Sequence, residues 1–179
     1  ICDICGGEIG LLGNKKLEDG NCCKECAGKL SPWFNERRHS TVADIKAQIE
    51  YREENRNAVA KFHTTQSFGE DMNVLLDEDQ QLFMVTRARN LVEANPDVLS
   101  FSQVTGCDLD ISESRTEEMR ETRDKDGNTK RVSYNPPRYV YRYDFYIIIR
   151  VNHPYFDEMR FKLNRSSVEV EVTGRQTLG

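Results

Sequence analysis

The sequence predicts an α+β protein with a small cysteine module at its N-terminus, a helical connector and a larger antiparallel β domain. Two Cys-x2-Cys pairs lie within the first 26 of its 179 residues. Apolar residues then recur with helical spacing, and beyond Phe62 they alternate with polar residues, which is typical of strands with one solvated face. We expect the three parts to span residues 1–36, 37–61 and 62–179, with a charged hairpin arm at residues 113–131.

Four cysteines of the cysteine module (residues 1–36) have the spacing of a structural metal site. Cys2 and Cys5 form the first pair, and Cys23 and Cys26 form the second. Each pair places two thiolates on one tight turn, so that four sulfur atoms can converge on one tetrahedral ion. The module has few aliphatic side chains, and a unit of this size usually depends on its metal to fold. The sequence therefore predicts structural Zn²⁺ bound by these four cysteines.

Cys22 leaves the choice of the third ligand open, because it directly precedes Cys23. Cys23 keeps the Cys-x2-Cys spacing with Cys26, so we choose Cys23 and expect Cys22 to be a hairpin side chain. Cys107 lies on the apolar side of an alternating strand, where a buried and inert thiol is expected. Free thiols beside a thiolate metal site favour a reducing compartment, so the predicted location is cytoplasmic.

Turn and helix signals complete the first two parts. Gly6 allows a positive φ after the first cysteine pair, residues 8–22 predict a small hairpin, and residues 24–30 predict a short helix. Turn, hairpin and ligand-bearing helix follow one another as in a treble-clef zinc finger. Trp33 and Phe34 are expected to pack this finger against the next part of the chain.

The connector has a clear helix start. Thr41 is a suitable N-cap, and Asp44 occupies the capping-box position three residues later. The apolar residues Val42, Ile45 and Ile49 lie on one face of such a helix. We expect one or two helices between residues 40 and 62, too few turns for a coiled coil.

The β domain is predicted from period-two alternation. Residues 74–76 and 81–86 predict a hairpin, and residues 104–111, 159–163 and 168–172 predict further strands. The clearest strand is 138–151, in which every odd position is apolar or aromatic. A strand of this length spans roughly 45 Å, so it must bend, bulge or project from a small domain.

Composition and motifs narrow the possible functions. The net charge of −5 and the pI near 5.3 argue against a general affinity for nucleic acid. The sequence has no apolar run long enough for a membrane-spanning helix, and residues 124–135 lack the glycine and glutamate of a calcium loop. Phosphate-binding and hydrolase motifs are also missing, so we expect no catalytic residue, no small-molecule substrate and no enzymatic activity.

Several segments resemble a bacterial family of unknown function that is defined by an N-terminal zinc-binding domain. They are Cys-x2-Cys-Gly-Gly at residues 2–7 and the segments 10–13, 19–20, 29–34, 37–41, 104–110 and 152–156. The resemblance implies the ligands Cys2, Cys5, Cys23 and Cys26, with Cys22 as a departure from the pattern, and it implies no activity. The order of the β strands is similar to that of bacterial pleckstrin-homology-like domains, which implies a partial barrel.

The function expected from these observations is that of a zinc-stabilised interaction or scaffold protein. Its partner would be another protein or a second copy, bound through the β domain, because sheets recruit partners at their edges and grooves. Two alternatives remain open at this point. One is a nucleic-acid-binding zinc finger protein, and the other is a small enzyme that uses the thiol of Cys22 or Cys107.

Overall fold

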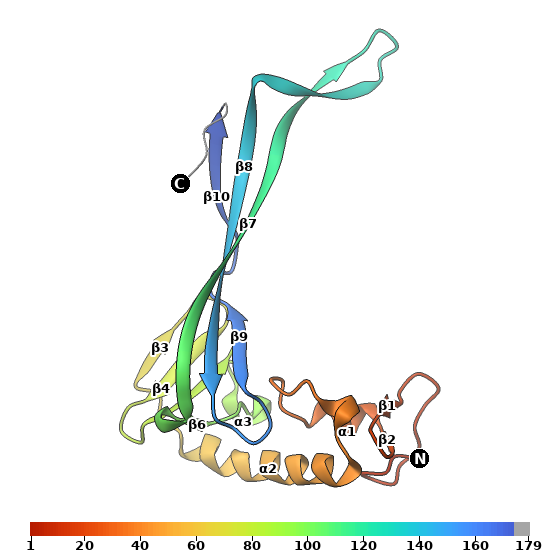
Figure 1. The fold of residues 1–179 in the computed structure, drawn as a ribbon, viewed down its shortest axis with the longest axis vertical. Helices are drawn as coiled ribbons and strands as arrows, with labels where there is room; N and C mark the ends of the chain where they lie inside the picture. The colour runs from red at the N-terminus through yellow and green to blue at the C-terminus, as the bar shows by residue number, and fades with distance from the viewer. Residues whose placement is uncertain (174–179) are drawn as a thin grey trace.

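The computed structural model describes residues 1–173, which form the cysteine module, one long helix and two larger antiparallel sheets (Figure 1). The cysteine module contains the short strands β1 (Lys15–Lys16) and β2 (Asn21–Cys22) and helix α1 (Lys24–Gly28). A 3₁₀ turn, Arg37–His39, leads into α2 (Val42–Lys61). The remaining elements are β3 (Gln66–Phe68), β4 (Asn73–Asp77), β5 (Leu82–Thr86), α3 (Leu91–Ala94), β6 (Leu99–Ser100), a 3₁₀ turn (Phe101–Gln103), β7 (Val104–Arg123), β8 (Thr129–Val151), β9 (Glu158–Lys162) and β10 (Val168–Thr173).

Helix α2 begins at the predicted capping box. The Thr41 hydroxyl accepts a hydrogen bond from the Asp44 backbone N–H, and the Asp44 carboxylate accepts one from the Thr41 N–H, both at 3.1 Å. The predicted connector is thus a single helix. Val42, Ile45 and Ile49 pack against the cysteine module, as their spacing predicts. Among the described residues, no helix combines the length and the apolar character needed to cross a membrane.

The two larger sheets pack face to face around the main hydrophobic core. One sheet has the strand order β3-β4-β5-β6, and the other contains β7, β8, β9 and β10. The first sheet contributes Phe83, Val85 and Leu99 to the core. The second contributes Ile149, Val151, Met159 and Phe161. Trp33 of the cysteine module also packs against this core, which confirms its predicted packing role.

Strands β7 and β8 form one continuous ribbon that extends far beyond the packed sheets (Figure 1). The predicted strands 104–111 and 138–151 and the predicted charged arm at residues 113–131 are all parts of this ribbon, whose tip is a turn with Gly127 at φ 81°. Strand β9 pairs with the inner part of β8, and β10 pairs with residues 138–143 farther out. The ribbon bends near residues 134–137, where Pro136 and Pro137 lack the N–H that the ladder needs.

The expected partial barrel is wrong. Within residues 1–173 neither large sheet closes or curls into a barrel. The physical reason is the length of β7 and β8. They leave the packed sheets and project, and β10 follows β8 outward instead of returning to cover an open end. The resemblance to pleckstrin-homology-like domains therefore does not extend beyond the order of the strands.

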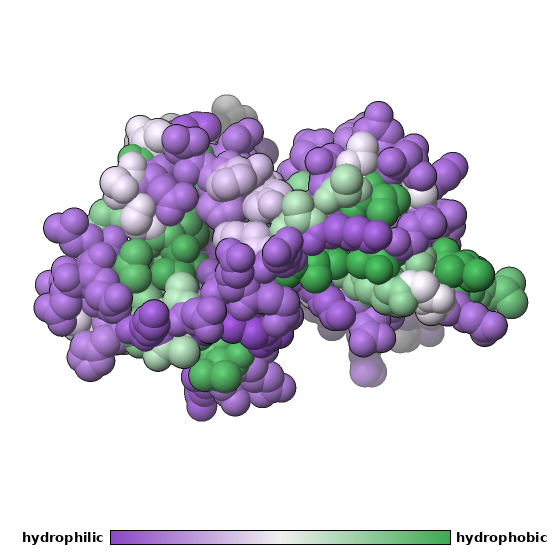
Figure 2. All heavy atoms as spheres, turned by 90° about the horizontal axis from the view of Figure 1, so that it is seen from below, coloured by the Kyte–Doolittle hydropathy of each residue, from purple (hydrophilic) through white to green (hydrophobic). Residues whose placement is uncertain are grey.

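The surface opposite the ribbon is mainly hydrophilic (Figure 2). Its hydrophobic side chains gather in separate patches, on the side of the cysteine module and on the side of the sheets. Leu11 and Leu12 of the cysteine module are fully exposed. Two adjacent exposed leucines form too small an apolar surface to mark an interaction site by themselves.

A buried carboxylate joins four parts of the fold. Asp97 lies in the segment before β6 and accepts hydrogen bonds from the Ser31 hydroxyl at 2.7 Å and the Tyr51 hydroxyl at 2.9 Å. Arg52 forms an ion pair with it at 3.1 Å. The Tyr51 oxygen lies 2.9 Å from Nε2 of His153, in the turn between β8 and β9. The cysteine module, α2 and the segment before the first sheet thus meet at Asp97, and Tyr51 extends the contact to the turn of the second sheet.

Helix α2 binds its neighbours through a stripe of buried polar side chains. Gln48, Arg52 and Asn55 are all buried and lie on one face of the helix. Their hydrogen bonds join Gln48 to the N–H of Ser31, Arg52 to the carbonyl of Lys29, and Asn55 to the carbonyl of Pro96. The helix is therefore held by specific polar contacts along most of its length, and by apolar packing mainly at its N-terminal end.

We expect Asp97→Ala to lower the free energy of unfolding by about 3–5 kcal/mol, because Arg52 would keep a buried charge without its partner. Chemical denaturation measures this. The matched control is Glu53→Ala on the same helix, which removes an exposed ion pair with Arg56 and should cost less than about 1 kcal/mol. Equal effects of the two substitutions would show that Asp97 does not hold the parts together.

Candidate metal centre

The structure brings the four predicted ligands together. The sulfur atoms of Cys2, Cys5, Cys23 and Cys26 all lie within 4.8 Å of one another, and those of Cys5 and Cys23 are 3.8 Å apart. A Zn–S bond of about 2.3 Å gives a regular tetrahedron with edges of about 3.8 Å. The donor set and its dimensions therefore fit a structural zinc ion. Such an ion would supply no chemistry beyond holding the two turns together, because four protein thiolates leave no open coordination position.

Backbone N–H groups prepare the cluster for a cation. The N–H groups of Ile4 and Cys23 point to the Cys2 sulfur at 3.4 and 3.2 Å, and that of Cys26 points to the Cys23 sulfur at 3.3 Å. Burial alone would raise the pKa of the Cys2 thiol, but these and neighbouring backbone donors outweigh burial and lower the pKa to about 6. The lowered pKa favours the thiolate of Cys2, which is the form that binds a metal ion.

The pKa of the Cys26 thiol is shifted in the opposite direction to that of Cys2. Burial and hydrogen bonds among the clustered sulfurs raise its pKa well above the ordinary value of a thiol. A metal ion therefore has to displace a proton from Cys26, because only the thiolate is a ligand. The affinity of the cluster for zinc should accordingly increase with pH.

Cys22 lies outside the cluster, on strand β2. Its side chain is fully buried, and its thiol donates to the Cys23 carbonyl oxygen at 3.3 Å. Burial, together with the charges of Cys2 and Cys23, raises the pKa of Cys22 to about 11. This geometry agrees with the predicted role of a hairpin side chain. A buried thiol with a raised pKa is also a poor nucleophile.

The expectation that Cys107 is buried is wrong. Cys107 is exposed on β7, opposite the buried Ile149 of β8. The alternation predicts the correct face of the strand, since paired residues share one face of an antiparallel sheet. It could not show that β7 is an edge strand, where the same face is less covered than on the central strand β8.

Two carboxylates that the cysteine spacing does not indicate stabilise the cysteine module and its junction with α2. The carboxylate of Asp3 accepts a hydrogen bond from Asn21 N–H at 2.7 Å, and that of Asp19 accepts one from Val42 N–H at 2.8 Å. Gly20 lies between these contacts. A Cβ atom there would lie 2.6 Å from the Asp3 carboxylate and 2.7 Å from a methyl group of Val42. The Asp19-Gly20 pair is recognisable in the sequence only as a turn.

Comparison with known families supports the domain that the cysteine spacing predicts. Residues 1–48 match the family model described as "Domain of unknown function (DUF4428)". This segment contains the whole cysteine cluster and the start of α2. No curated protein and no solved structure matches the chain. The resemblance of residues 104–110 and 152–156 to the longer family members lies outside the matched segment and stays a prediction.

We expect the purified protein to contain about one zinc ion per chain, and we expect Cys23→Ser to lose it, because a hydroxyl is a poor substitute for a thiolate ligand. Cys22→Ser is the matched control and should keep the ion. Elemental analysis of the two variants after dialysis gives the answer. If Cys22→Ser loses zinc and Cys23→Ser keeps it, Cys22 is the third ligand and Cys23 is not.

Chelation should unfold residues 1–34 and leave the packed sheets folded. The cysteine module has only a small apolar cluster around its sulfur atoms, whereas the sheets have their own core. Hydrogen exchange with and without a chelator resolves the two regions. If residues 138–163 lost protection to the same extent as the cysteine module, the two parts would instead unfold as one unit.

Proposed function

We propose that this chain is a non-catalytic interaction protein whose zinc-bound module and packed sheets form a base for the projecting β7–β8 ribbon. The ribbon would pair with the ribbon of a second copy of the chain. The observation that carries this proposal is an apolar face of the ribbon that continues outward from the core. We call it the apolar face and define it by Leu109 and Ile111 of β7 and Tyr143, Phe145 and Ile147 of β8.

The apolar face is exposed where the first sheet no longer covers it. Leu109 is opposite Ile147, and Ile111 is opposite Phe145, so these side chains share one side of the ribbon. Leu109 and Ile111 are 56% and 53% exposed, and Val168 of β10, opposite Tyr143, is 46% exposed. Contiguous apolar surface of this kind usually marks an interaction site on a soluble protein.

The reverse side of the ribbon needs no partner. It carries a ladder of ion pairs that join neighbouring strands. The pairs are Arg160–Asp110 at 2.8 Å, Arg150–Asp108 at 2.9 Å, Lys162–Asp144 at 3.0 Å and Arg142–Glu169 at 3.0 Å. These charges also oppose burial of the reverse side in an interface, because desolvating charged pairs is costly. The ribbon therefore offers one side for binding.

A second copy is the occupant that the charge pattern favours. Beyond Ile111 the same side of β7 continues with Glu113, Arg115 and Glu117. Acidic and basic residues thus alternate along the border of the apolar face. Two copies related by a two-fold axis therefore do not bring together two borders that carry charges of a single sign. The outer edge of β7 also has no strand beside it among the described residues, and such edges favour pairing with another strand.

Neither alternative function has comparable support. The net charge of −5 disfavours binding along a nucleic-acid backbone. A thiol enzyme would need an accessible, activated cysteine, and Cys22 is buried with a raised pKa. Cys107 is accessible, but it lies on the apolar side of the ribbon and not in a cleft with a base.

Light scattering across a concentration series should detect a dimer, and Ile111→Lys should abolish it because a buried charge would face an apolar surface. The matched control is Ser112→Lys, the neighbouring exposed residue on the charged side of the ribbon, which should dimerise normally. Alkylation of Cys107 should also become slower as the concentration rises. A wild-type chain that stays monomeric throughout the series, or a dimer that Ile111→Lys leaves intact, contradicts the proposal.

A further inference from the structure

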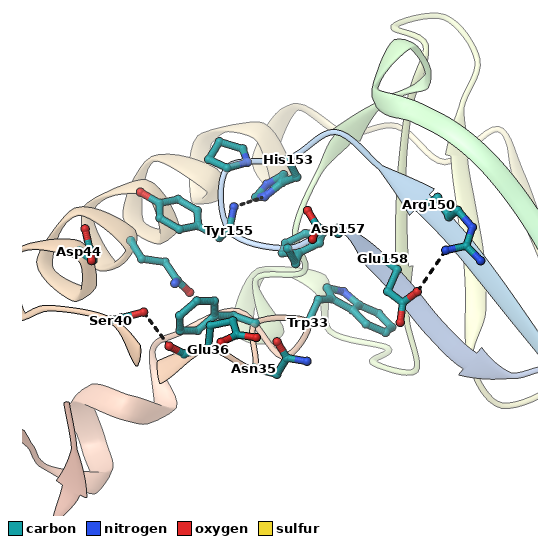
Figure 3. A pocket seen from close by; sticks show the side chains of 14 residues that line it. Trp33, Asn35, Glu36, Ser40, Asp44, Arg150, His153, Tyr155, Asp157 and Glu158 are labelled. Atoms are coloured by element: carbon teal, nitrogen blue, oxygen red, sulfur yellow. Dashed lines mark hydrogen bonds and ion pairs between the residues drawn. The ribbon is translucent and has the colours of Figure 1, made fainter. Parts of the chain in front are cut away.

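A cleft of about 670 Å³ lies where the cysteine module and α2 meet the turn between β8 and β9. Figure 3 shows Trp33, Asn35 and Glu36 on one side of it and His153 and Tyr155 on the other. The two sides come from residues 33–48 and 150–158, which are far apart in the sequence. The cleft is thus formed only when the cysteine module is docked on the sheets, and it is separate from both the cysteine cluster and the apolar face of the ribbon.

Aromatic rings form much of the wall of the cleft. Trp33, Tyr155 and Phe156 line it, and the imidazole of His153 is stacked on Phe156 with ring centroids 4.0 Å apart. The faces of aromatic rings attract cations, and tryptophan does so most strongly. These side chains therefore give the cleft a surface that suits an organic cation with an apolar stem.

The charge of the cleft is negative. Glu36, Asp44, Asp157 and Glu158 line it, and Arg150 is its one lining cation among the described residues. Arg150 is already shared between Glu158 and an aspartate of β7. Within residues 1–173, the carboxylates of Glu36 and Asp157 have neither an ion pair nor a hydrogen-bond donor, so a cation entering the cleft would find two free carboxylates.

The titratable rings of the cleft do not offset this charge. Burial lowers the pKa of His153 below its ordinary value, so the imidazole is neutral at pH 7. Its Nδ1 accepts a hydrogen bond from the Tyr155 N–H at 3.2 Å, which also requires the unprotonated nitrogen. Burial raises the pKa of Tyr155, and the nearby charges of Asp44 and Glu50 raise it further.

A buried amide in the wall of the cleft has a free donor. Gln48 is only 1% exposed, and its Oε1 accepts a hydrogen bond from Ser31 N–H at 2.9 Å. That bond fixes the orientation of the amide, because the nitrogen could not accept from an N–H group. Its Nε2 has no hydrogen-bond partner among the described residues. Buried donors are nearly always paired, so this one calls for an acceptor.

We propose that the cleft binds a basic amino-acid unit, an arginine or lysine side chain together with its own carbonyl group. The cation would lie against the ring of Trp33 and between the carboxylates of Glu36 and Asp157. The carbonyl oxygen would accept a hydrogen bond from Gln48 Nε2. Aromatic faces, free carboxylates and one amide donor together match this combination, and none of the three features belongs to the proposed dimer contact.

The chain contains its own probe for this test. Trp33 is its single tryptophan, so intrinsic fluorescence reports on the cleft directly. We expect a saturable change on titration with N-acetylarginine amide. The neutral isostere N-acetylcitrulline amide should bind at least roughly tenfold more weakly, because it keeps the carbonyl and loses the charge. The peptide Gly-Arg-Gly distinguishes the sources. Tighter binding than the single residue indicates a protein segment, and equal binding indicates a small basic compound.

Substitutions separate the two parts of the recognition. Glu36→Gln combined with Asp157→Asn, both at exposed positions, should weaken binding of N-acetylarginine amide roughly tenfold. The matched control is Glu53→Gln combined with Glu121→Gln, two exposed carboxylates that do not line the cleft, and it should leave binding unchanged. Gln48→Leu should weaken binding of N-acetylarginine amide but not of agmatine, which has the guanidinium and lacks the carbonyl. Circular dichroism establishes whether the Gln48→Leu variant is folded. The Glu36→Gln, Asp157→Asn variant changes only exposed residues, so it tests the site independently of the Gln48→Leu variant.

Three results would overturn the proposal. The first is no saturable change of Trp33 fluorescence with any arginine compound up to millimolar concentration. The second is equal binding of the arginine and citrulline amides, which would show that charge is not recognised. The third is unchanged affinity in the Glu36→Gln, Asp157→Asn variant, which would place the ligand elsewhere.

Discussion

The fold depends on the buried carboxylate of Asp97, which accepts hydrogen bonds from three donors in two other parts of the chain. Ser31 belongs to the cysteine module, and Tyr51 and Arg52 belong to α2. Each donor is satisfied only when all of these parts are docked, and a buried polar group without its partner is costly. The contact therefore makes the arrangement specific. It holds Trp33 against the sheets and positions the turn that contains His153, and so it determines the shape of the cleft between them.

The sequence predicts the parts of this protein that depend on local chemistry. The cysteine spacing, the Thr41–Asp44 capping box and the alternation along β8 each involve neighbouring residues, and the structure has all three. The polar stripe of α2 is different. Gln48, Arg52 and Asn55 are residue types that normally face solvent, and their burial follows only from backbone groups of distant segments that lie opposite them. Periodicity of apolar residues could not reveal this face.

The expected barrel, which residues 1–173 do not form, and the cleft likewise depend on contacts between segments that are distant in the sequence. Alternation in β7 and β8 predicts which side chains share a face, but it does not determine whether two long strands curl over a core or continue past it. That choice depends on what covers them, as the exposed Cys107 illustrates. The cleft is equally invisible in the sequence, since Glu36 and Asp157 become neighbours of one cavity only after the cysteine module has docked. The four cysteines were predictable because a metal site imposes a strict spacing on its ligands.

The ribbon also has a mechanical consequence. Its interstrand hydrogen bonds are perpendicular to β7 and β8, and the register extends from Gly106–Arg150 to Arg123–Thr129 with one interruption near Glu118. Opposite pulls on the two strands along their axes would therefore load many of these bonds in shear at once. A sideways pull that separates the strands loads the bonds one after another, and it has to start at the base of the ribbon, because the turn at Gly127 joins the strands at the tip. At that base Val151 is buried in the main core, so the ribbon is held closed at both of its ends.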